Sequence, residues 1–335
     1  MTARRASGAQ MKSRRQFLRD AGQVSASLAL FSPLLASMTG CAEQSGVLRL
    51  QASWVNDAEF IGYFVAMSQK LYENERLDFQ YQSGGPEIVA DSVLLANGAD
   101  IALTTPDVTI NAILKQKAPF KIIGAQYQKN PLGIVSLEKN NIRVPHDLVG
   151  KTLAAPPANV LTVQAFLKIN NIPASEVRVV PYQYDPSPLL NGEVDATLDF
   201  VTNVPFTIQQ RGGSPTSFLL YDHGFQIFND TVVVHEETLA KRRSELTSWL
   251  RASRKGWEEN FKDPAAWPPR LANTYFKGSG RSIQNEIYFN RAQQPLIQTA
   301  SGLLSLSPSA VDATIRSLQA VGIEAHRDMF VMDLL

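Results

Sequence analysis

The sequence predicts an α/β fold in which mostly parallel sheets are flanked by helices. Short apolar runs typical of strands alternate, as far as Val234, with segments whose apolar residues recur every three to four positions, the period of a helix. After Val234 the pattern is helical throughout. Because strands that alternate with helices form parallel sheets with helices on both faces, this alternation defines the fold class.

Ten segments carry the strand pattern, and they are 47–53, 77–82, 101–104, 120–126, 133–137, 152–155, 177–182, 196–200, 217–220 and 231–234. Between most of them lie helical patterns, such as the one formed by Phe60, Phe64, Met67 and Leu71. Later in the chain an apolar stripe predicts a core-facing helix, with members Leu246, Trp249, Leu250, Trp257 and Phe261. We interpret Trp249, Trp257 and Trp267 as packing residues.

The first forty residues predict a cleavable export signal. Residues 13–18, Ser-Arg-Arg-Gln-Phe-Leu, have the form of a twin-arginine signal, and an uncharged apolar stretch follows at 21–35. That stretch is too short for a membrane-spanning helix of about 20 residues. Residues 38–41, Met-Thr-Gly-Cys, resemble a bacterial lipobox. The alternative is a buried N-terminal helix with a chance arginine pair.

We therefore expect a signal peptide at 1–40, lipidation at Cys41 and a short stalk at 41–46. The protein would be exported to the periplasm or the outer face of the cytoplasmic membrane, and held at the membrane by the lipid on Cys41. Cys41 is the only cysteine of the chain, so no disulfide can form within it.

The charge balance of the processed chain excludes a nucleic-acid binder. Residues 1–40 contain six basic residues and one acidic residue; subtracting them from the totals of 32 and 31 leaves 26 and 30. A net charge of −4 offers no basic footprint for phosphates. The four histidines are scattered without metal-ligand spacing, and no catalytic elbow or phosphate-binding glycine motif is present. We expect no metal, no cofactor and no enzyme activity.

Five junctions between a strand and the following helix carry polar capping residues. They are Ser83-Gly84-Gly85, Thr105, Asn159, Asp185 and Asn203. In open α/β sheets this carboxyl edge of the strands is where ligands bind, with helix N-termini supplying free N–H groups. Each junction alone is explained by ordinary helix capping; five of them favour a shared crevice.

A segment rich in aromatic residues follows the first strand. Trp54, Asn56, Phe60 and Tyr63 combine flat ring faces with a polar group that could fix the edge of a ring. This mixture suits a planar heterocycle, which gains from stacking and a few directed hydrogen bonds. The alternative is that these side chains belong to the core beneath the first helix.

Several motifs in fixed order resemble a known family. They are Trp54, Asn56, Phe60-x-Gly62-Tyr63-x-x-Ala66, Tyr72, Leu77-Asp78, Ser83-Gly84-Gly85-Pro86, Asn97-Gly98-Ala99-Asp100, Asp147-Leu148-x-Gly150-Lys151, Gly192-Glu193-Val194-Asp195-Ala196 and Asp263-Pro264 with Trp267. Over residues 47–298 the chain resembles the periplasmic solute-binding proteins of ABC importers that are related to thiamine-pyrimidine synthases.

The resemblance implies a two-lobed periplasmic-binding-protein (type II) fold that closes on a small ligand by hinge bending and docks on a membrane permease. Residues 47–128 plus 225–335 would form lobe 1, and residues 129–224 would form lobe 2. We expect a monomer that delivers a planar nitrogen heterocycle, a thiamine-pyrimidine precursor or riboflavin-like molecule. A sulfonate or nitrate binder and a ligand sensor for a membrane partner are the alternatives.

The resemblance also assigns site residues. Ring contacts would come from Trp54, Phe60 and Tyr63, with Asn56 nearby. Hydrogen bonds from lobe 1 would come from Ser83, Gly84, Gly85, Thr104 and Thr105. The remaining expected residues are Asn159, Asp185 and Asn203 of lobe 2, Tyr127 near the hinge and Asn229 beside the return crossing.

The synthase branch of the resembled family is the alternative from the class of enzymes. It would need a lysine and a nearby histidine after the third strand, and a cysteine-rich iron site before the last strand. Here the matching stretches are Leu103–Val108 and Gly224–Asp230, which contain no lysine, histidine or cysteine. The synthase chemistry is therefore disfavoured.

Overall fold

A computed structural model describes residues 46–335, so the predicted signal peptide and Cys41 lie outside the described residues. All ten predicted strands are present, with ends that differ from the prediction by at most two residues. They are β1 (Leu48–Gln51), β2 (Phe79–Gln82), β3 (Ile101–Thr104), β4 (Phe120–Tyr127), β5 (Leu132–Leu137), β6 (Thr152–Ala155), β7 (Arg178–Pro181), β8 (Ala196–Phe200), β9 (Pro215–Leu219) and β10 (Asn229–His235).

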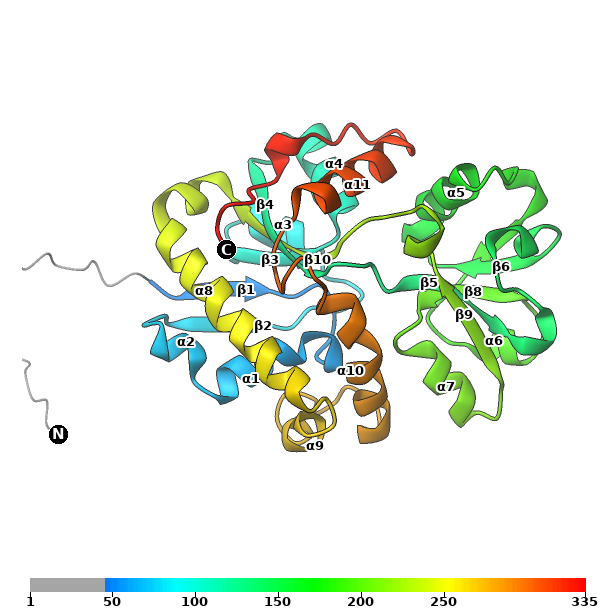
Figure 1. Cartoon of the computed structure of the whole chain (residues 1–335), viewed down its shortest axis with the longest axis horizontal. Helices are drawn as coiled ribbons and strands as arrows, with labels where there is room; N and C mark the ends of the chain where they lie inside the picture. The colour runs from blue at the N-terminus through cyan, green and yellow to red at the C-terminus, as the bar shows by residue number, and fades with distance from the viewer. Residues whose placement is uncertain (1–45) are drawn as a thin grey trace, which may run out of the picture. The chain divides into compact units, whose positions relative to one another are not determined.

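The strands form two five-stranded sheets (Figure 1), with the orders β2-β1-β3-β10-β4 and β7-β6-β8-β5-β9. In the first sheet β10 is antiparallel to both of its neighbours, and in the second sheet β5 is antiparallel to both of its neighbours. The other strands of each sheet run in one common direction. The α/β prediction is confirmed, and the sheets are mixed.

The reversed strands are those that follow a crossing between the sheets. The chain leaves β4 of the first sheet and enters the second sheet as β5, and it leaves β9 and returns as β10. Strands β4 and β10 are paired neighbours, so both crossings leave the first sheet side by side. This connectivity keeps the two sheets joined by residues 128–131 and 220–228.

Eleven α-helices lie in the described residues: α1 (Ile61–Ser68), α2 (Leu71–Asn74), α3 (Ala90–Leu95), α4 (Pro106–Gln116), α5 (Val160–Ile169), α6 (Ser187–Leu190), α7 (Val204–Gln210), α8 (Glu236–Lys262), α9 (Trp267–Leu271), α10 (Ile283–Ile297) and α11 (Pro308–Gln319). The region after β10 is helical, as predicted. Short 3₁₀ turns include η1 (Ala58–Phe60), which leads into α1.

Alternate side chains of each strand enter different cores. In the first sheet Ile101 and Leu103 face the core shared with α1 and α8, while Ala102 of the same strand faces α3 and α4. In the second sheet Leu153 packs towards α5 and Ala154 towards α6 and α7. This alternation follows from the two-residue period of a strand. Both sheets are thus covered on both faces.

Helix α8 packs its apolar side chains into the core that it shares with α1 and the first sheet. Trp249 and Trp257 are fully buried, and Trp267 is nearly so, which confirms their interpretation as packing residues. A Cβ atom on Gly62 would lie 2.2 Å from the Trp257 ring, and one on Gly256 would lie 2.2 Å from the Gly62 carbonyl oxygen. These two glycines therefore allow α1 and α8 to meet at van der Waals distance.

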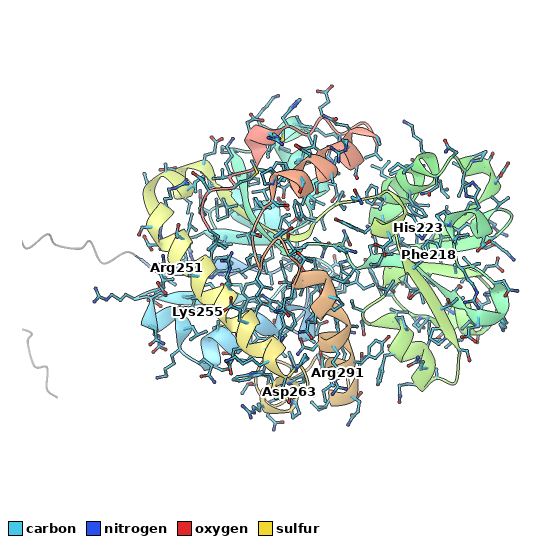
Figure 2. All side chains as sticks on the ribbon, in the orientation of Figure 1. Phe218, His223, Arg251, Lys255, Asp263 and Arg291 are labelled. Atoms are coloured by element: carbon cyan, nitrogen blue, oxygen red, sulfur yellow. The ribbon has the colours of Figure 1, made fainter. Side chains whose placement is uncertain are left out.

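The outward face of α8 is polar. Arg251 and Lys255 (Figure 2) approach the Glu75 carboxylate at 2.8 and 3.6 Å. Because both basic side chains are at least half exposed, such pairs add well under about 1 kcal/mol each to stability. The stability of this lobe therefore rests on the buried aromatic layer beneath them.

Candidate ligand-binding site

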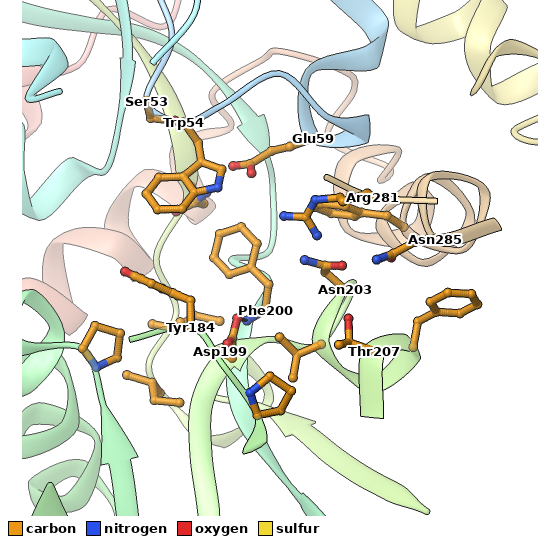
Figure 3. A pocket seen from close by; sticks show the side chains of 18 of the residues that line it. Ser53, Trp54, Glu59, Tyr184, Asp199, Phe200, Asn203, Thr207, Arg281 and Asn285 are labelled. Carbon is orange, nitrogen blue, oxygen red and sulfur yellow. Dashed lines mark hydrogen bonds between the residues drawn. The ribbon is translucent and has the colours of Figure 1, made fainter. Parts of the chain in front are cut away.

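A cavity of about 670 Å³ lies between the two sheets. Its walls include residues that follow β1 and β3 of the first sheet and residues at the end of β8 in the second sheet. Helix α10 closes one side with Asn285 and Phe289 (Figure 3). The cavity therefore sits at the carboxyl ends of strands from both sheets, the edge at which open α/β folds bind ligands.

Aromatic rings from both sheets face this cavity. The Trp54 ring, after β1, lies 5.4 Å from the Tyr184 ring, after β7, with 55° between the two planes. Phe200 at the end of β8 adds a further ring to the wall (Figure 3). Tyr184 has a left-handed backbone (φ 59°) and is 51% exposed as a residue. The rings offer flat apolar faces that the opening of the cavity leaves accessible.

A pair of buried carboxyls, Glu59 and Asp230, lies on the first-sheet side. Asp230 accepts hydrogen bonds from Ser53 Oγ (2.9 Å) and from Gln126 Nε2 (3.2 Å). Burial raises the pKa of Asp230 to about 6. Burial also raises the pKa of Glu59 well above its ordinary value, and the neighbouring Asp230 carboxyl adds to this rise. Burial thus disfavours the charged form of both carboxyls.

Across the cavity, Asp199 on β8 is a third buried carboxyl. Its Oδ1 accepts a hydrogen bond from the Phe200 backbone N–H at 2.7 Å; no donor among residues 46–335 meets hydrogen-bond geometry at Oδ2, although the neighbouring Tyr182 hydroxyl lowers the pKa of this carboxyl. Burial raises the pKa of Asp199 to about 6. The unpartnered oxygen lies in a residue that is only 7% exposed and lines the cavity. Within the described residues, this oxygen lacks a hydrogen bond that would offset the cost of its burial.

One arginine on the α10 side has its charge already balanced. Arg281 approaches the Asp57 carboxylate, Nη2 to Oδ2, at 3.0 Å. Its neighbour Glu286 accepts a hydrogen bond from the Ala58 backbone N–H at 2.8 Å, and burial raises the pKa of Glu286 to about 7. This network ties α10 to η1 and fixes the wall that carries Arg281.

Two amide side chains complete the polar lining. The Oδ1 atoms of Asn203 and Asn285 are buried and have no hydrogen-bond partner among the described residues. Both residues line the cavity, one from the start of α7 and the other from α10 (Figure 3). Because an unpartnered buried polar atom is costly, these atoms are poised for a ligand or bound water.

The structure places five of the predicted site residues in the cavity wall. They are Trp54, Thr105, Asn159, Asn203 and Asn229. Four of these five follow a strand or precede a helix, as the junction argument requires. Thr105 and Asn159 occupy the N-cap positions of α4 and α5, and neither caps with its side chain. Their polar side-chain groups therefore make no capping hydrogen bond to the first turn of the helix.

Other predicted residues lie outside the wall. Phe60 and Tyr63 are fully buried in the core, where Tyr63 stacks on Trp249 at 5.8 Å. Tyr127 is also buried and donates a hydrogen bond to Gln293 Oε1 at 2.6 Å. The alternative interpretation of the aromatic segment as core thus describes Phe60 and Tyr63: α1 turns the Tyr63 ring towards α8, and Phe60 at the end of η1 packs near Tyr81 of β2, 6.3 Å between ring centroids.

The remaining predicted residues support neighbouring groups. Thr104 donates to Asp91 at 2.6 Å, and Asp185 accepts from Arg211 at 2.7 Å and from Ser187. Gly84 donates its N–H to the Trp54 carbonyl oxygen at 2.8 Å. Asn56, Ser83 and Gly85 are not part of the cavity wall either. Their direct contact with a ligand has no support in the geometry.

Sequence reasoning missed the acidic groups and the α10 wall. Glu59, Asp199 and Asp230 each stand within four residues of a predicted site residue, so extending each motif along the chain would have found them. Arg281, Asn285 and Phe289 repeat every four residues on one face of α10 or just before it. That spacing is the same for a core-facing helix, so no sequence signal marks them as site residues.

Two helix-covered sheets, joined by paired crossings and separated by a cavity, form the periplasmic-binding-protein fold. A family model described as NMT1/THI5 like matches residues 57–266. The match covers more than half of the chain, and the chain belongs to this family. The predicted family resemblance is confirmed.

Solved structures share this fold at low sequence identity. The alkanesulfonate-binding protein SsuA from Xanthomonas axonopodis pv. citri, bound to MOPS, is 14% identical with a TM-score of 0.62, and the match covers 85% of this chain and 97% of that one. A Candida albicans protein described as having the generic periplasmic binding protein fold is 12% identical with a TM-score of 0.59, covering 85% and 93%.

The desulfurization enzyme DszB is a third neighbour, 11% identical with a TM-score of 0.54, covering 86% of this chain and 97% of that one. The fold is therefore found in an enzyme as well as in binding proteins. No curated protein sequence matches significantly.

Two further findings concern residues 46–335. None of the helices in this range is both long and apolar enough to cross a membrane. Within the same range, no three acidic, histidine or cysteine side chains converge in a way that could hold a metal ion.

Proposed function

We propose that this protein is an extracytoplasmic solute-binding protein that delivers a small planar nitrogen heterocycle to an ABC importer. The observation that carries the proposal is the cavity between the sheets, with rings on its walls and directed polar groups at its base. The family membership and the fold of the structural neighbours support a binding function. Lobe 1 would comprise 47–128 plus 225–335, and lobe 2 would comprise 129–224.

The lining favours a ring over a sulfonate anion. Trp54, Tyr184 and Phe200 supply flat faces, and Glu59, Asp199 and Asp230 supply carboxyl oxygens. Acceptor oxygens pair with ring N–H and amino groups, whereas they repel the oxygens of a sulfonate. The sulfonate alternative is suggested by the ligand of the SsuA neighbour. The two arginines of the cavity wall, Arg211 and Arg281, already pair with Asp185 and Asp57.

A ligand screen by thermal denaturation tests this function. Aminopyrimidines, thiamine, riboflavin, taurine, alkanesulfonates and nitrate would be compared. A ligand at about 100 times its dissociation constant should stabilise the fold by roughly 2.7 kcal/mol. We expect one aminopyrimidine or riboflavin-like compound to raise the melting temperature. A shift with sulfonates alone would contradict the heterocycle and leave the binding function standing.

Removing the Trp54 ring should weaken binding. We expect Trp54→Ala to cost about 2 kcal/mol, or roughly thirtyfold in affinity for the ligand found in the screen, because a stacked aromatic anchor is lost. The control is Trp54→Phe, which keeps a ring and should retain most of the affinity. Titration calorimetry measures both variants; an unchanged dissociation constant for Trp54→Ala would exclude the stacking role.

The membrane tether is a separate proposal. Lipidation of Cys41 is supported by the lipobox-like residues 38–41. Replacing Cys41 with serine should move the protein from the membrane to the soluble extracellular or periplasmic fraction, as judged by fractionation. Membrane association that persists in Cys41→Ser would contradict the anchor. Transport and sensing would be distinguished by uptake of the labelled ligand in cells with and without the protein.

A further inference from the structure

The cavity contains more acidic groups than its own cations balance. Its wall includes Glu59, Asp107, Asp199 and Asp230, and two arginines. Each arginine already has an acidic partner outside the wall: Arg281 pairs with Asp57 at 3.0 Å, and Arg211 pairs with Asp185 at 2.7 Å. Asp107 stands in the first turn of α4, where a helix N-terminus stabilises negative charge. Among the described residues, no ion pair involves Glu59, Asp199 or Asp230, although, against the larger effect of burial, the Arg281 charge lowers the pKa of Glu59 and of Asp199.

The Glu59–Asp230 pair has its hydrogen bonds arranged for one negative charge. Asp230 accepts from two donors, Ser53 Oγ and Gln126 Nε2. A carboxyl that accepts two hydrogen bonds ionises more readily, so Glu59 is the member of the pair that holds a proton more tightly. A positively charged donor that enters the cavity would replace this proton and allow both carboxyls to ionise.

The opposite wall presents a third acceptor to the same space. Asp199 has an unpartnered Oδ2 in a residue that is 7% exposed, and Asn285 has an unpartnered Oδ1 in a residue that is 8% exposed. In Figure 3 Glu59 and Asp199 lie on opposite sides of the Phe200 ring, and the Trp54 ring lies beside Glu59. A flat molecule among these rings would therefore meet carboxyls at both edges.

We propose that the cavity selects a cation: a small planar ring whose positively charged N–H edge binds the Glu59–Asp230 pair of the first sheet, and whose opposite edge donates to Asp199 of the second sheet. This inference rests on the proposed binding function and narrows its ligand class. The chemistry required is that of a protonated aminopyridine or aminopyrimidine, which spreads one positive charge over a flat ring with several N–H donors.

Other titratable groups around Glu59 do not replace the ligand's charge. Asp57, Glu286, Tyr81 and Tyr127 are acidic or neutral near pH 7, and burial and nearby carboxyls raise the pKa of both tyrosines. Arg281 lowers the pKa of Glu59 only as the smallest of the contributing causes. Cation binding should therefore strengthen as the pH rises from 5 to 7.5 and the carboxyl pair loses its proton.

Three ring probes of similar size test the charge selection in the full chain, in buffer with EDTA. They are 4-aminopyridine, which is protonated throughout this pH range, the neutral benzamide and the anionic benzenesulfonate. By calorimetry at pH 7.5 we expect 4-aminopyridinium to bind at least tenfold more tightly than benzamide, and benzenesulfonate to bind more weakly still. At pH 5 the affinity for 4-aminopyridinium should fall at least tenfold, and that for benzamide should change little.

Substitutions of single carboxyls test which residues select the charge of the ligand. Glu59→Gln and Asp199→Asn should each lower the affinity for 4-aminopyridinium at least tenfold and leave benzamide within about threefold. Because each removes a buried acid, the melting temperature of the free variants at pH 7.5 should not fall, which shows that they fold. Glu258→Gln, on the exposed face of α8 and outside the cavity wall, is the matched control and should bind like the native protein.

The outcomes separate the two proposals. Equal affinity for 4-aminopyridinium and benzamide would overturn the charge selection and leave the heterocycle binder standing. Tighter binding of benzenesulfonate would overturn both the cation and the heterocycle. Failure of all three probes at millimolar concentration would overturn the inference together with the proposed ring-binding function.

Discussion

Replacing Gly84 with alanine is expected to lower the free energy of unfolding by about 3 kcal/mol and to weaken ligand binding at the same time. A Cβ atom there would lie 2.4 Å from the Ala52 carbonyl oxygen and 2.6 Å from the backbone nitrogen of Trp54. These neighbours are backbone atoms, which cannot rotate away as a side chain can. The segment that carries Trp54 would have to shift, and the hydrogen bond from Gly84 N–H to the Trp54 carbonyl oxygen would be strained.

The next residue provides a matched control for this prediction. A Cβ atom on Gly85 would meet only Val55 Cγ1, at 3.9 Å, which is ordinary contact. Gly85→Ala should therefore leave both the chemical denaturation midpoint and the dissociation constant within error of the native values. Equal behaviour of the two variants would show that the close approach at Gly84 has no energetic consequence.

The second large effect is on pH-dependent stability. Burial raises the pKa of Asp199 and of Asp230 to about 6 from an ordinary value of 3.8, and that of Glu286 to about 7 from 4.5. A carboxyl with a raised pKa binds its proton more tightly in the folded chain than in the unfolded one. Its contribution to stability is therefore fully present below its ordinary pKa and is lost as the pH rises through the folded value.

We expect the ligand-free protein to lose stability between pH 5 and pH 8. Asp199 alone should account for a change on the order of 2 kcal/mol. Surface carboxyls with lowered pKa, such as Glu75 and Asp312, act only below about pH 4.5 and do not oppose this trend. Urea denaturation at several pH values measures the effect.

Substitution of Asp199 measures its contribution to the pH dependence of the unfolding free energy. Asp199→Asn should flatten the dependence of the unfolding free energy on pH between 5 and 8, because the amide does not titrate. Asp78→Asn, at an exposed position outside the cavity wall, should leave the slope unchanged. A native protein whose stability is constant or rises across this range would contradict the burial argument.

The positions of the strands could be predicted from the sequence because short apolar runs lie between segments with a helical period. Runs such as 101–104 and 196–200 are buried on both faces, so almost every residue of them is apolar or small. The direction of a strand within its sheet cannot be predicted from this pattern. Strands β5 and β10 have the same apolar pattern as their neighbours but run antiparallel to them. Only the crossings between the sheets, which are contacts distant in sequence, decide that direction.

Only some of the residues that line the cavity could be predicted from the sequence, for a related reason. Trp54, Thr105 and Asn203 could be predicted because each follows a strand, and the carboxyl ends of strands gather at one edge. Phe60 and Tyr63 have the same local pattern, but η1 and α1 place their rings in the core. The α10 wall is about 230 residues from Trp54 in sequence, and its spacing of four residues is that of any packed helix.

The distribution of tryptophans allows ligand binding to be followed by intrinsic fluorescence. Of the four tryptophans in the chain, Trp249, Trp257 and Trp267 are enclosed in the core, and only Trp54 lines the cavity, beside Tyr184. The fluorescence emission of the three core tryptophans should not change when a ligand binds in the cavity. A change in intrinsic fluorescence on adding a ligand would therefore come from a single indole, and Trp54→Phe would remove the signal while leaving the fold to be followed through the others.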